Sequence, residues 1–445
     1  MGLSWLQTLA TWIEHTFWSR MDEQMWSCLP DTALVEIYLY LHDRDRVNMA
    51  KACKNWNKVF SYPCLWRTRY IELGGYRAKL AGERALKFAD MHGAHVRYLF
   101  LSCNHPSSHT CKVIQMTVDN FLEKIHHATI VHFELERLNL NRFWKFENLK
   151  EKVVNSFVRF FSGQRNMVNF DMLAAHFTLT SGCRILEAVG SASGSTIKDL
   201  DIEDFFHSRL AMFQVKRFRN AFSKFTNLSN VSLNYNCLSD DIFESMVKHL
   251  AGKLKNINCK IYRTDPHFHR ISSFSWRKLK SVCPELSIDF WFEGIGMSSD
   301  TTRILVPGAP VRKLHMWTGY DDNADWQLGE TIDHIAAHHK QIVVVSMELD
   351  NNNEAIDVNL VKLVTECKCL RELYINAIVT VAAIDEICTL QTQGKINLHT
   401  FHVTTCGLTQ IECAELMYIK DKHLPIMEER GLNFRIASDY LTEFL

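Results

Sequence analysis

Two cysteines and two histidines lie close together in one polar stretch: Cys103, His105, His109 and Cys111. Thiolate and imidazole groups are the ligands that hold structural zinc in a tetrahedral site. Their C-x-H-x3-H-x-C spacing is tighter than the spacing in the usual zinc-binding modules. We therefore predict neither a metal site nor a metal cofactor from this stretch.

Further histidines fall on a predicted helix, where His334 and His338 are one turn apart. A zinc-protease helix needs a glutamate directly after its first histidine, and residue 335 is an isoleucine. The pair Cys367 and Cys369 is better explained by packing than by redox chemistry. The glycine-rich phosphate loops and the Gly-x-Ser-x-Gly motif do not occur. We predict no catalytic residue, no cofactor and a non-enzymatic role.

The composition argues against several classes of protein. Apolar residues make up 47% of the 445 residues and charged residues 22%, as in globular proteins. The 50 Lys and Arg equal the 50 Asp and Glu, so the basic excess typical of a nucleic-acid-binding protein is missing. No apolar run reaches the length of about 18 residues that predicts a membrane span. The 14 cysteines follow no secretory signal, which predicts reduced thiols in the cytoplasm or nucleus.

The first 25 residues are predicted to be an N-terminal extension. Aromatic and aliphatic residues recur between Trp5 and Trp18, with charged residues among them. This pattern predicts a short amphipathic helix that packs against protein, or an extension upstream of an internal start at Met21.

Residues 26–70 predict a module of three short helices. Pro30 followed by Asp31 is a typical helix start. An apolar stripe at helical spacing follows, and a second helix carries Cys53 and Trp56 until a proline ends it. A core of about 45 residues is small and normally needs a partner or a neighbouring domain.

The order and spacing of these residues resemble the F-box family. The matching features are a Leu-Pro pair, an apolar helical stripe, a Cys-x-x-Trp step and a closing Leu-Trp pair. Ala52 stands where the family more often has Val, and an ordinary helical hairpin is the alternative interpretation. The resemblance implies docking on a Skp adaptor that is held by a cullin–RING scaffold. It implies adaptor contacts by Leu29, Pro30, Leu34, Ile37 and Leu41, and a helical core containing Cys53, Trp56, Leu65 and Trp66.

From about residue 90, a strand-like pattern of three apolar residues at positions i, i+3 and i+5 recurs. Such triplets are frequent by chance in a chain so rich in apolar residues, so the inference depends on their spacing. Successive triplets begin 26 to 37 residues apart, which predicts stacked strand–helix units. The eleven triplets are Val96/Leu99/Leu101, Ile130/Phe133/Leu135, Met167/Phe170/Met172, Ile197/Leu200/Ile202, Leu228/Val231/Leu233, Leu254/Ile257/Cys259, Cys283/Leu286/Ile288, Val311/Leu314/Met316, Ile342/Val345/Met347, Leu370/Leu373/Ile375 and Leu398/Phe401/Val403.

The repeating part resembles the leucine-rich repeat. Residues 228–238 match its consensus at every fixed position. The consensus Asn or Cys occurs only at Asn104, Asn236 and Cys406, so we expect some irregular repeats. The predicted fold is α/β, with a small all-α F-box over 26–70, a linker helix over 71–94 and a leucine-rich-repeat-like α/β solenoid, or horseshoe, over 95–445.

Alternate residues on the strands of such a solenoid face its concave surface. In the second to fourth predicted repeats these positions include six carboxylates and no Lys or Arg. We hypothesise that this strip binds a basic segment of a protein substrate, because charge complementarity selects partners. A solvated polar surface is the alternative. The six residues are Glu134, Glu136, Asp171, Asp199, Asp201 and Glu203.

The two resemblances together imply the substrate-recognition subunit of an SCF-type (Skp–cullin–F-box) E3 ubiquitin ligase. The F-box would dock on the Skp adaptor, and the solenoid would bind the protein to be ubiquitinated. Such a subunit raises the effective concentration of substrate near the transferring enzyme and forms no covalent bond itself. The alternative is a leucine-rich-repeat protein-binding scaffold that acts without a ubiquitin ligase. We expect neither nucleic acid nor a membrane as a partner.

Overall fold

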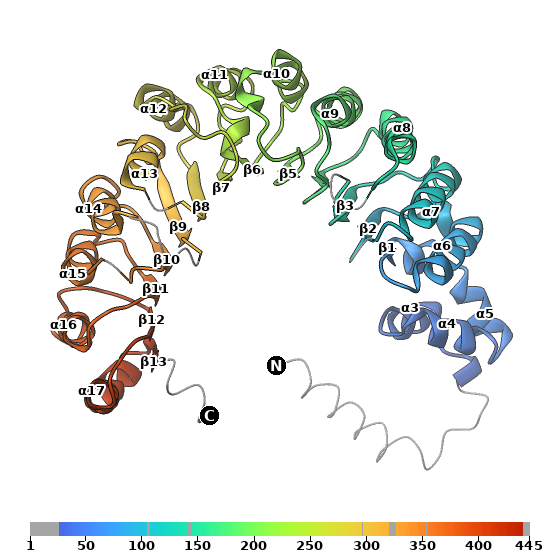
Figure 1. The fold of residues 1–445 in the computed structure, drawn as a ribbon. Helices are drawn as coiled ribbons and strands as arrows, with labels where there is room; N and C mark the ends of the chain where they lie inside the picture. The colour runs from blue at the N-terminus through green and yellow to red at the C-terminus, as the bar shows by residue number, and fades with distance from the viewer. Residues whose placement is uncertain are drawn as a thin grey trace, which may run out of the picture.

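The computed structural model describes residues 26–104, 107–140, 144–295, 297–319, 326–352 and 354–438. The described chain forms a long arc, with short strands on the inner side and helices on the outer side (Figure 1). Three short helices of the N-terminal module lie at one end of the arc, and the last helix and strand lie at the other. The mixed α/β solenoid predicted from the repeat spacing is therefore confirmed.

One parallel sheet of 13 strands runs through the whole arc. The strands follow one another in chain order, and each pairs in parallel with its neighbours. They are β1 (Thr68–Glu72), β2 (Tyr98–Ser102), β3 (His132–Glu136), β4 (Asn169–Asp171), β5 (Asp199–Ile202), β6 (Asn230–Asn234), β7 (Asn256–Tyr262), β8 (Ser287–Glu293), β9 (Val311–Trp317), β10 (Val344–Glu348), β11 (Glu372–Asn376), β12 (Thr400–Thr405) and β13 (Asn433–Ser438).

An α-helix connects each strand to the next and covers the outer side of the sheet. Helix caps fix where several of them begin; for example, the Ser239 hydroxyl accepts a hydrogen bond from the Ile242 amide at 3.3 Å. The helices are α6 (Ala78–His92), α7 (Cys111–Lys124), α8 (Glu147–Gly163), α9 (Leu179–Ser193), α10 (Lys216–Phe222), α11 (Asp240–His249), α12 (Ser273–Val282), α13 (Ser298–Ile304), α14 (Leu328–His338), α15 (Asp357–Glu366), α16 (Val381–Thr392) and α17 (Gln410–Glu429). No helix in the described parts of the chain is long and apolar enough to cross a membrane.

The N-terminal module contains α3 (Asp31–Leu39), α4 (Asp43–Ala50), α5 (Lys54–Phe60) and the 3-10 turn η1 (Pro63–Trp66). The expectation of one helix running up to and through Cys53 is wrong. Cys53 has extended backbone angles, φ −156° and ψ 171°, and therefore separates α4 from α5.

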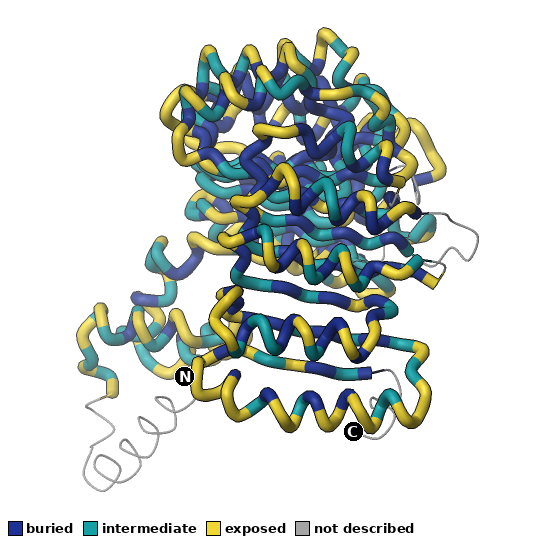
Figure 2. The backbone as a smooth tube through the Cα atoms, turned by 90° about the vertical axis from the view of Figure 1, so that its left-hand side faces the viewer, coloured by how far each residue is buried: buried dark blue, intermediate teal, exposed yellow. Residues whose placement is uncertain are grey.

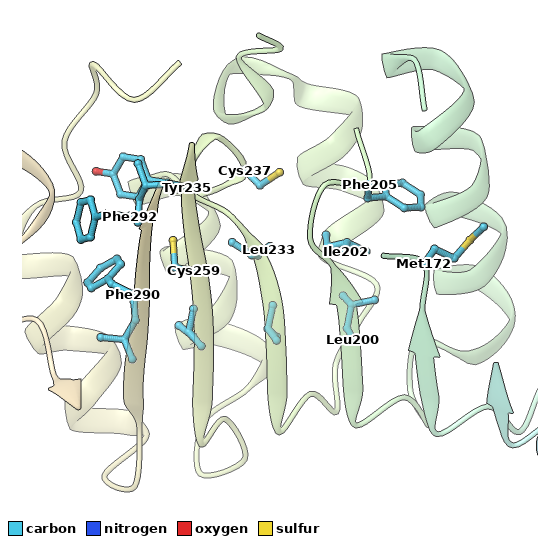
Figure 3. Close-up of a cluster of buried hydrophobic side chains, with 14 of the residues drawn as sticks. Met172, Leu200, Ile202, Phe205, Leu233, Tyr235, Cys237, Cys259, Phe290 and Phe292 are labelled. Carbon is cyan, nitrogen blue, oxygen red and sulfur yellow. The ribbon is translucent and has the colours of Figure 1, made fainter. Parts of the chain in front are cut away.

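The helix-facing side chains of the strands form one continuous core. Every residue of the eleven predicted triplets is buried. Figure 3 shows a central part of this core, where Leu200 on β5, Leu233 on β6 and Phe290 on β8 lie among the buried side chains. Along the strands, buried residues alternate with partly exposed ones, whereas the outer helices carry most of the exposed residues (Figure 2). This alternation is the period of two expected for strands with one buried face.

The triplet that ends at Ile288 is out of register. Ile288 pairs with Ile257, the middle residue of the preceding triplet, and Cys259 pairs with Phe290. The physical reason is that β8 buries three alternating apolar residues, Ile288, Phe290 and Phe292. The i, i+3, i+5 apolar pattern can therefore be placed on this strand in more than one register. An irregularity between Ile288 and Asp289, where β8 meets β9, also interrupts the regular spacing.

The triplet pattern missed the first and last strands. In β1, Arg69 stands opposite Leu99, so a charged residue holds a core-facing position. In β13, Phe434 pairs with Phe401, but Gly431 is found three residues earlier, where the template needs an apolar side chain. The missing strands therefore depart from the pattern at a single position each.

Strand β1 lies across the expected boundary between residues 70 and 71 and pairs with β2. Helix α6 lies beside α7 in the outer row of helices, as Figure 1 shows. We therefore propose that the solenoid begins with β1 and that α6 is its first helix.

Candidate functional site

The residues expected to contact the adaptor lie on α3 and directly beside it. Leu34 is 0% exposed and packs in the core of the module, so its side chain is not available to a partner. Pro30 is exposed, whereas Leu29, Ile37 and Leu41 are half-buried against the core. The structure thus leaves four of the five residues at the surface of the module.

Sequence reasoning missed a more exposed aromatic residue at the end of α3. Tyr40 is 78% exposed and follows Ile37 by three residues, which places both on one side of the helix. An exposed aromatic side chain beside half-buried apolar ones is typical of a contact surface. The apolar and aromatic residues continue without a break from Ile37 to Leu41, and this run was the sequence signal that could have identified Tyr40.

Of the expected core residues of the module, Leu65 and Trp66 are buried, whereas Cys53 and Trp56 are half-buried. Leu65 and Trp66 are each 3% exposed. The Trp66 indole N–H donates to the Phe60 carbonyl at 2.8 Å. The half-buried Trp56 meets the Tyr38 ring edge-on at 6.1 Å.

Trp66 also joins the module to the solenoid. Its ring stacks on the His92 imidazole of α6, with centroids 4.0 Å apart and an interplanar angle of 11°. The Arg69 guanidinium of β1 lies 4.2 Å from the centre of the Phe88 ring and forms an ion pair with Asp43 of α4. Because these contacts belong to side chains of both parts, the orientation of the module on the solenoid is set by packing.

The six predicted carboxylates lie on the concave side of β3 to β5 or directly after these strands, in three different environments. Asp199 belongs to a row of hydrogen bonds that crosses five strands. Its two oxygens accept from the Asn169 amide at 2.7 Å and the Asn230 amide at 2.5 Å. The row continues from Asn256 to Asn230 at 2.7 Å and from Ser287 to Asn256 at 2.8 Å. Both oxygens of Asp199 are therefore hydrogen-bonded within the sheet.

Two more of the carboxylates lie beside cationic side chains of the chain itself, which compensate part of their charge. Glu136 lies 2.7 Å from Arg137 Nε. Glu203 lies 3.4 Å from the Nζ of Lys260, which also contacts Asp204 at 2.8 Å and Glu293 at 3.1 Å. These two glutamates are consequently less suited to attract a basic partner than their charge suggests.

The remaining three form a row across neighbouring strands: Glu134 pairs in register with Asp171, and Asp171 with Asp201. Burial and then the nearby charge of Asp201 raise the pKa of Asp171 to about 7. Burial likewise raises the pKa of Asp201 above its ordinary value. Like charges side by side destabilise each other, so a cationic side chain placed against this row would favour the ionised carboxylates. We call these three residues the acidic row.

An aromatic surface lies farther along the concave face, on β8 and β9. Trp291 is 46% exposed and stacks on His315, with ring centroids 3.7 Å apart. Sequence reasoning missed Trp291 because it assigned the wrong register to this strand. With Ile288, Phe290 and Phe292 as the buried residues, Trp291 alternates onto the concave side.

The candidate metal ligands differ in their surroundings. Cys103 and Cys111 are buried, which raises the pKa of their thiols to about 12 and about 11. Both thiols are therefore protonated at neutral pH, and His105 lies outside the described residues. Among the residues that the structure describes, no group of three or more His, Cys, Asp or Glu could hold a metal ion.

Two of the three histidines in and directly after α14 contact one backbone carbonyl, whereas His338 is exposed. The Nε2 atoms of His334 and His339 both lie within hydrogen-bond distance of the Leu305 carbonyl, at 2.7 and 3.1 Å. Cys367 is buried and Cys369 is exposed, and both are free thiols.

Comparison with known proteins gives the class of the N-terminal module. Residues 26–72 match the F-box-like family. The protein therefore combines an F-box-like domain with a leucine-rich-repeat-like solenoid.

The same combination is found in its relatives. F-box/LRR-repeat protein 21 of Mus musculus is 21% identical over 281 residues, which cover 60% of this chain and 59% of that protein. The Bos taurus protein of the same name is 21% identical over 359 residues, covering 78% of this chain and 76% of the relative. The Ovis aries protein is 22% identical over 305 residues, with 62% and 61% covered. The chain is thus homologous to F-box/LRR-repeat protein 21, and its match spans about three fifths of the mouse relative.

Proposed function

We propose that this chain is the substrate-recognition subunit of an SCF-type E3 ubiquitin ligase. The observation that supports this most directly is an F-box-like domain at 26–72 packed against a leucine-rich-repeat-like solenoid. In this proposal the F-box docks on the Skp adaptor, and a cullin–RING scaffold brings the ubiquitin-loaded enzyme. The solenoid holds the substrate, and the chain itself contributes positioning and no covalent step.

The proposed adaptor-binding surface consists of Leu29, Pro30, Ile37 and Leu41, extended by Tyr40. These apolar side chains on and around one helix suit an apolar groove between partner helices. Leu34 supports this surface from the core. The surface is small, so a single charge introduced at its exposed part should disrupt it.

The test is co-precipitation of the full chain with a Skp adaptor. Tyr40→Asp should abolish capture without unfolding the module, because Tyr40 is 78% exposed. Ile411→Asp is the matched control, since Ile411 is 81% exposed at the far end of the solenoid. Equal capture by wild type and Tyr40→Asp would reject this surface. Absence of any Skp or cullin contact by the wild type would favour the scaffold that acts without a ligase.

We further propose that the concave face binds a substrate segment with a basic residue and an aromatic or apolar one. The acidic row accepts the basic side chain, and the Trp291–His315 pair accepts the other. From β4 to β8 there are four strand spacings, or about 19 Å, which an extended segment of about six residues spans. The residues Asp199, Glu136 and Glu203 remain in the proposed surface as its neighbours, with their charge already partly compensated.

Proximity labelling under proteasome inhibition would test this surface. Substrate candidates are the proteins that both the wild type and the Tyr40→Asp variant label. Their labelling should be lost with the Asp171→Lys/Asp201→Lys variant. Loss of none of them would reject the acidic row as the binding surface.

We also propose a relationship to one particular F-box protein and a cellular compartment. Residues 43–46, 201–210 and 233–240 resemble F-box only protein 39, which points to a function close to that of this F-box protein. The structure places no disulfide among the 14 cysteines, and reduced thiols are typical of the cytoplasm and nucleus, where we expect the protein to act.

A further inference from the structure

The end of the solenoid beside the F-box is only partly covered. A groove of about 860 Å³ lies along the outer edge of β1 and the first turns of α6. Residues 69–72 of the strand form one wall, and Tyr76, Arg77 and Arg84 belong to the other. The F-box contacts the solenoid through η1, next to the start of β1, and among the described residues none before Arg69 lines the groove.

The backbone of β1 has groups on the side away from β2 that no described strand pairs. Arg67 accepts a hydrogen bond from Tyr98, and Leu73 donates one to Ser102, so the odd-numbered residues of β1 face β2. In a strand, alternate residues direct their N–H and C=O groups to opposite sides. Tyr70 therefore directs both groups away from β2. Since β1 is the first strand in the sheet order, no described strand pairs with that edge.

A tight turn lies at the end of the groove, directly after β1. A Cβ atom on Gly74 would lie 1.6 Å from the Asn104 carbonyl oxygen, so only glycine permits this close approach. The next residue, Gly75, has φ +66°, which also favours glycine. The chain is therefore tightly packed at the point where β1 ends.

The side chains around the groove are basic and aromatic. Arg77 directly precedes α6 and Arg84 lies on that helix, and both line the groove. Both are exposed, and neither forms an ion pair with a described residue. Tyr70 is 69% exposed and Tyr76 is 90% exposed. Glu72 is the single acidic residue in the lining.

We propose that this groove binds an extended acidic peptide of a partner protein, which adds one strand to the free edge of β1. Strand addition uses the unpaired backbone groups, and alternate side chains of the peptide select the sequence. On one side of the added strand, acidic side chains would meet Arg77 and Arg84. On the other side, an aromatic or β-branched side chain would lie beside Tyr70. The expected motif therefore alternates Asp or Glu with apolar residues.

The test is fluorescence anisotropy with the full chain and a labelled eight-residue peptide that alternates Glu with Val and Tyr. Arg84→Glu should weaken binding by about tenfold or more, since it reverses a charge in contact with the peptide. Lys79→Glu makes the same charge change on another side of α6 and should alter affinity by less than about twofold. Both side chains are exposed, so both variants should fold as wild type does.

A second peptide separates strand addition from simple charge attraction. Methylation of alternate backbone nitrogens keeps every charge but removes the donors that pair with β1, and it should reduce binding by about tenfold or more. Equal binding of the methylated peptide, or unchanged binding by Arg84→Glu, would overturn the proposal. Preference for a single-stranded RNA oligonucleotide over the peptide would overturn it as well. Because no adaptor is present, these outcomes do not depend on the ligase function.

Discussion

Asp171 illustrates how a residue's charge is set by its position on the concave sheet. Its pKa is about 7 in the folded protein and ordinarily 3.8. Between these values the folded chain keeps the proton while the unfolded chain has lost it, so stability from this group falls as pH rises. The same effect makes the acidic row more negative just above neutral pH.

We therefore predict that Asp171→Asn stabilises the protein, and more at pH 8 than at pH 5. The amide cannot ionise, so it avoids the cost of a buried charge. Urea unfolding at the two pH values measures the difference. Asp421→Asn, on the exposed side of α17, is the control and should show no such trend. A gain that does not grow with pH would mean that the buried charge of Asp171 is not its cause.

A buried histidine should produce the opposite pH dependence. His339 is 0% exposed, and burial lowers its pKa from 6.5 to about 4. Below pH 6.5 the unfolded chain takes up a proton that the folded chain does not, so stability is lost as pH falls from 6.5 toward 4. We predict that His339→Gln is less stable at pH 7 but loses less stability on acidification than wild type. Melting temperatures of the variant and the wild type, measured from pH 7 to pH 5, would show this difference. If the melting temperatures of both proteins fell equally with pH, the prediction would be wrong.

For single residues, sequence reasoning worked best where one pattern decided the environment. Trp66 and Leu65 are buried as the F-box resemblance implies. Leu34 was assigned to a contact surface because the stripe on a helix does not reveal which members face its own core. The different environments of the six carboxylates also escaped prediction, since Lys260 approaches Glu203 from a strand two positions farther along.

Among the secondary-structure elements, the hydrogen-bonded row from Asn169 to Ser287 ties five strands together across their concave side. Asn230 is at its centre, donating to Asp199 and accepting from Asn256. We predict that Asn230→Ala lowers the free energy of unfolding by about 1–3 kcal/mol, because two partly buried partners lose a hydrogen bond.

Chemical denaturation of the full chain would measure this loss. Asn258→Ala is the matched control, because its 3.1 Å bond to Ser232 is exposed and water can replace it. We expect a cost below about 1 kcal/mol for that control. Equal costs for the two variants would mean that the row does not act as a continuous unit.

The order of elements was predictable because most repeats bury apolar residues at positions i, i+3 and i+5. The spacing of 26 to 37 residues between these triplets is visible although the loops are irregular. The failures have local causes. Arg69 in β1 replaces an apolar residue yet is accommodated, since its guanidinium covers the Phe88 ring. Cys53 breaks a helix whose apolar spacing continues on both sides, so the spacing alone could not show the break.

For the molecule as a whole, the relative placement of the F-box and the solenoid was not predictable from the sequence. It depends on a few contacts between segments that are separated in the chain, such as the Trp66–His92 stack and the Arg69–Asp43 ion pair. A ligase subunit gains from such a junction, because a fixed orientation keeps the substrate near the transferring enzyme. A flexible junction would lower that effective concentration.

We predict that His92→Ala/Arg69→Ala loosens this junction without unfolding either part. The alanines remove the ring that stacks on Trp66 and the guanidinium that covers Phe88, while the strand pairing of β1 with β2 remains. Hydrogen exchange should accelerate over η1 and β1, and small-angle scattering should show a broader distribution of distances. Lys124→Ala is the control, since it removes an ion pair between α7 and Asp90 of α6, away from the F-box. Capture of the Skp adaptor should survive in both variants, because the surface around Tyr40 is untouched. Unchanged exchange over η1 and β1 would show that the backbone connection alone fixes the orientation, and the side-chain junction would then have no role in positioning the substrate.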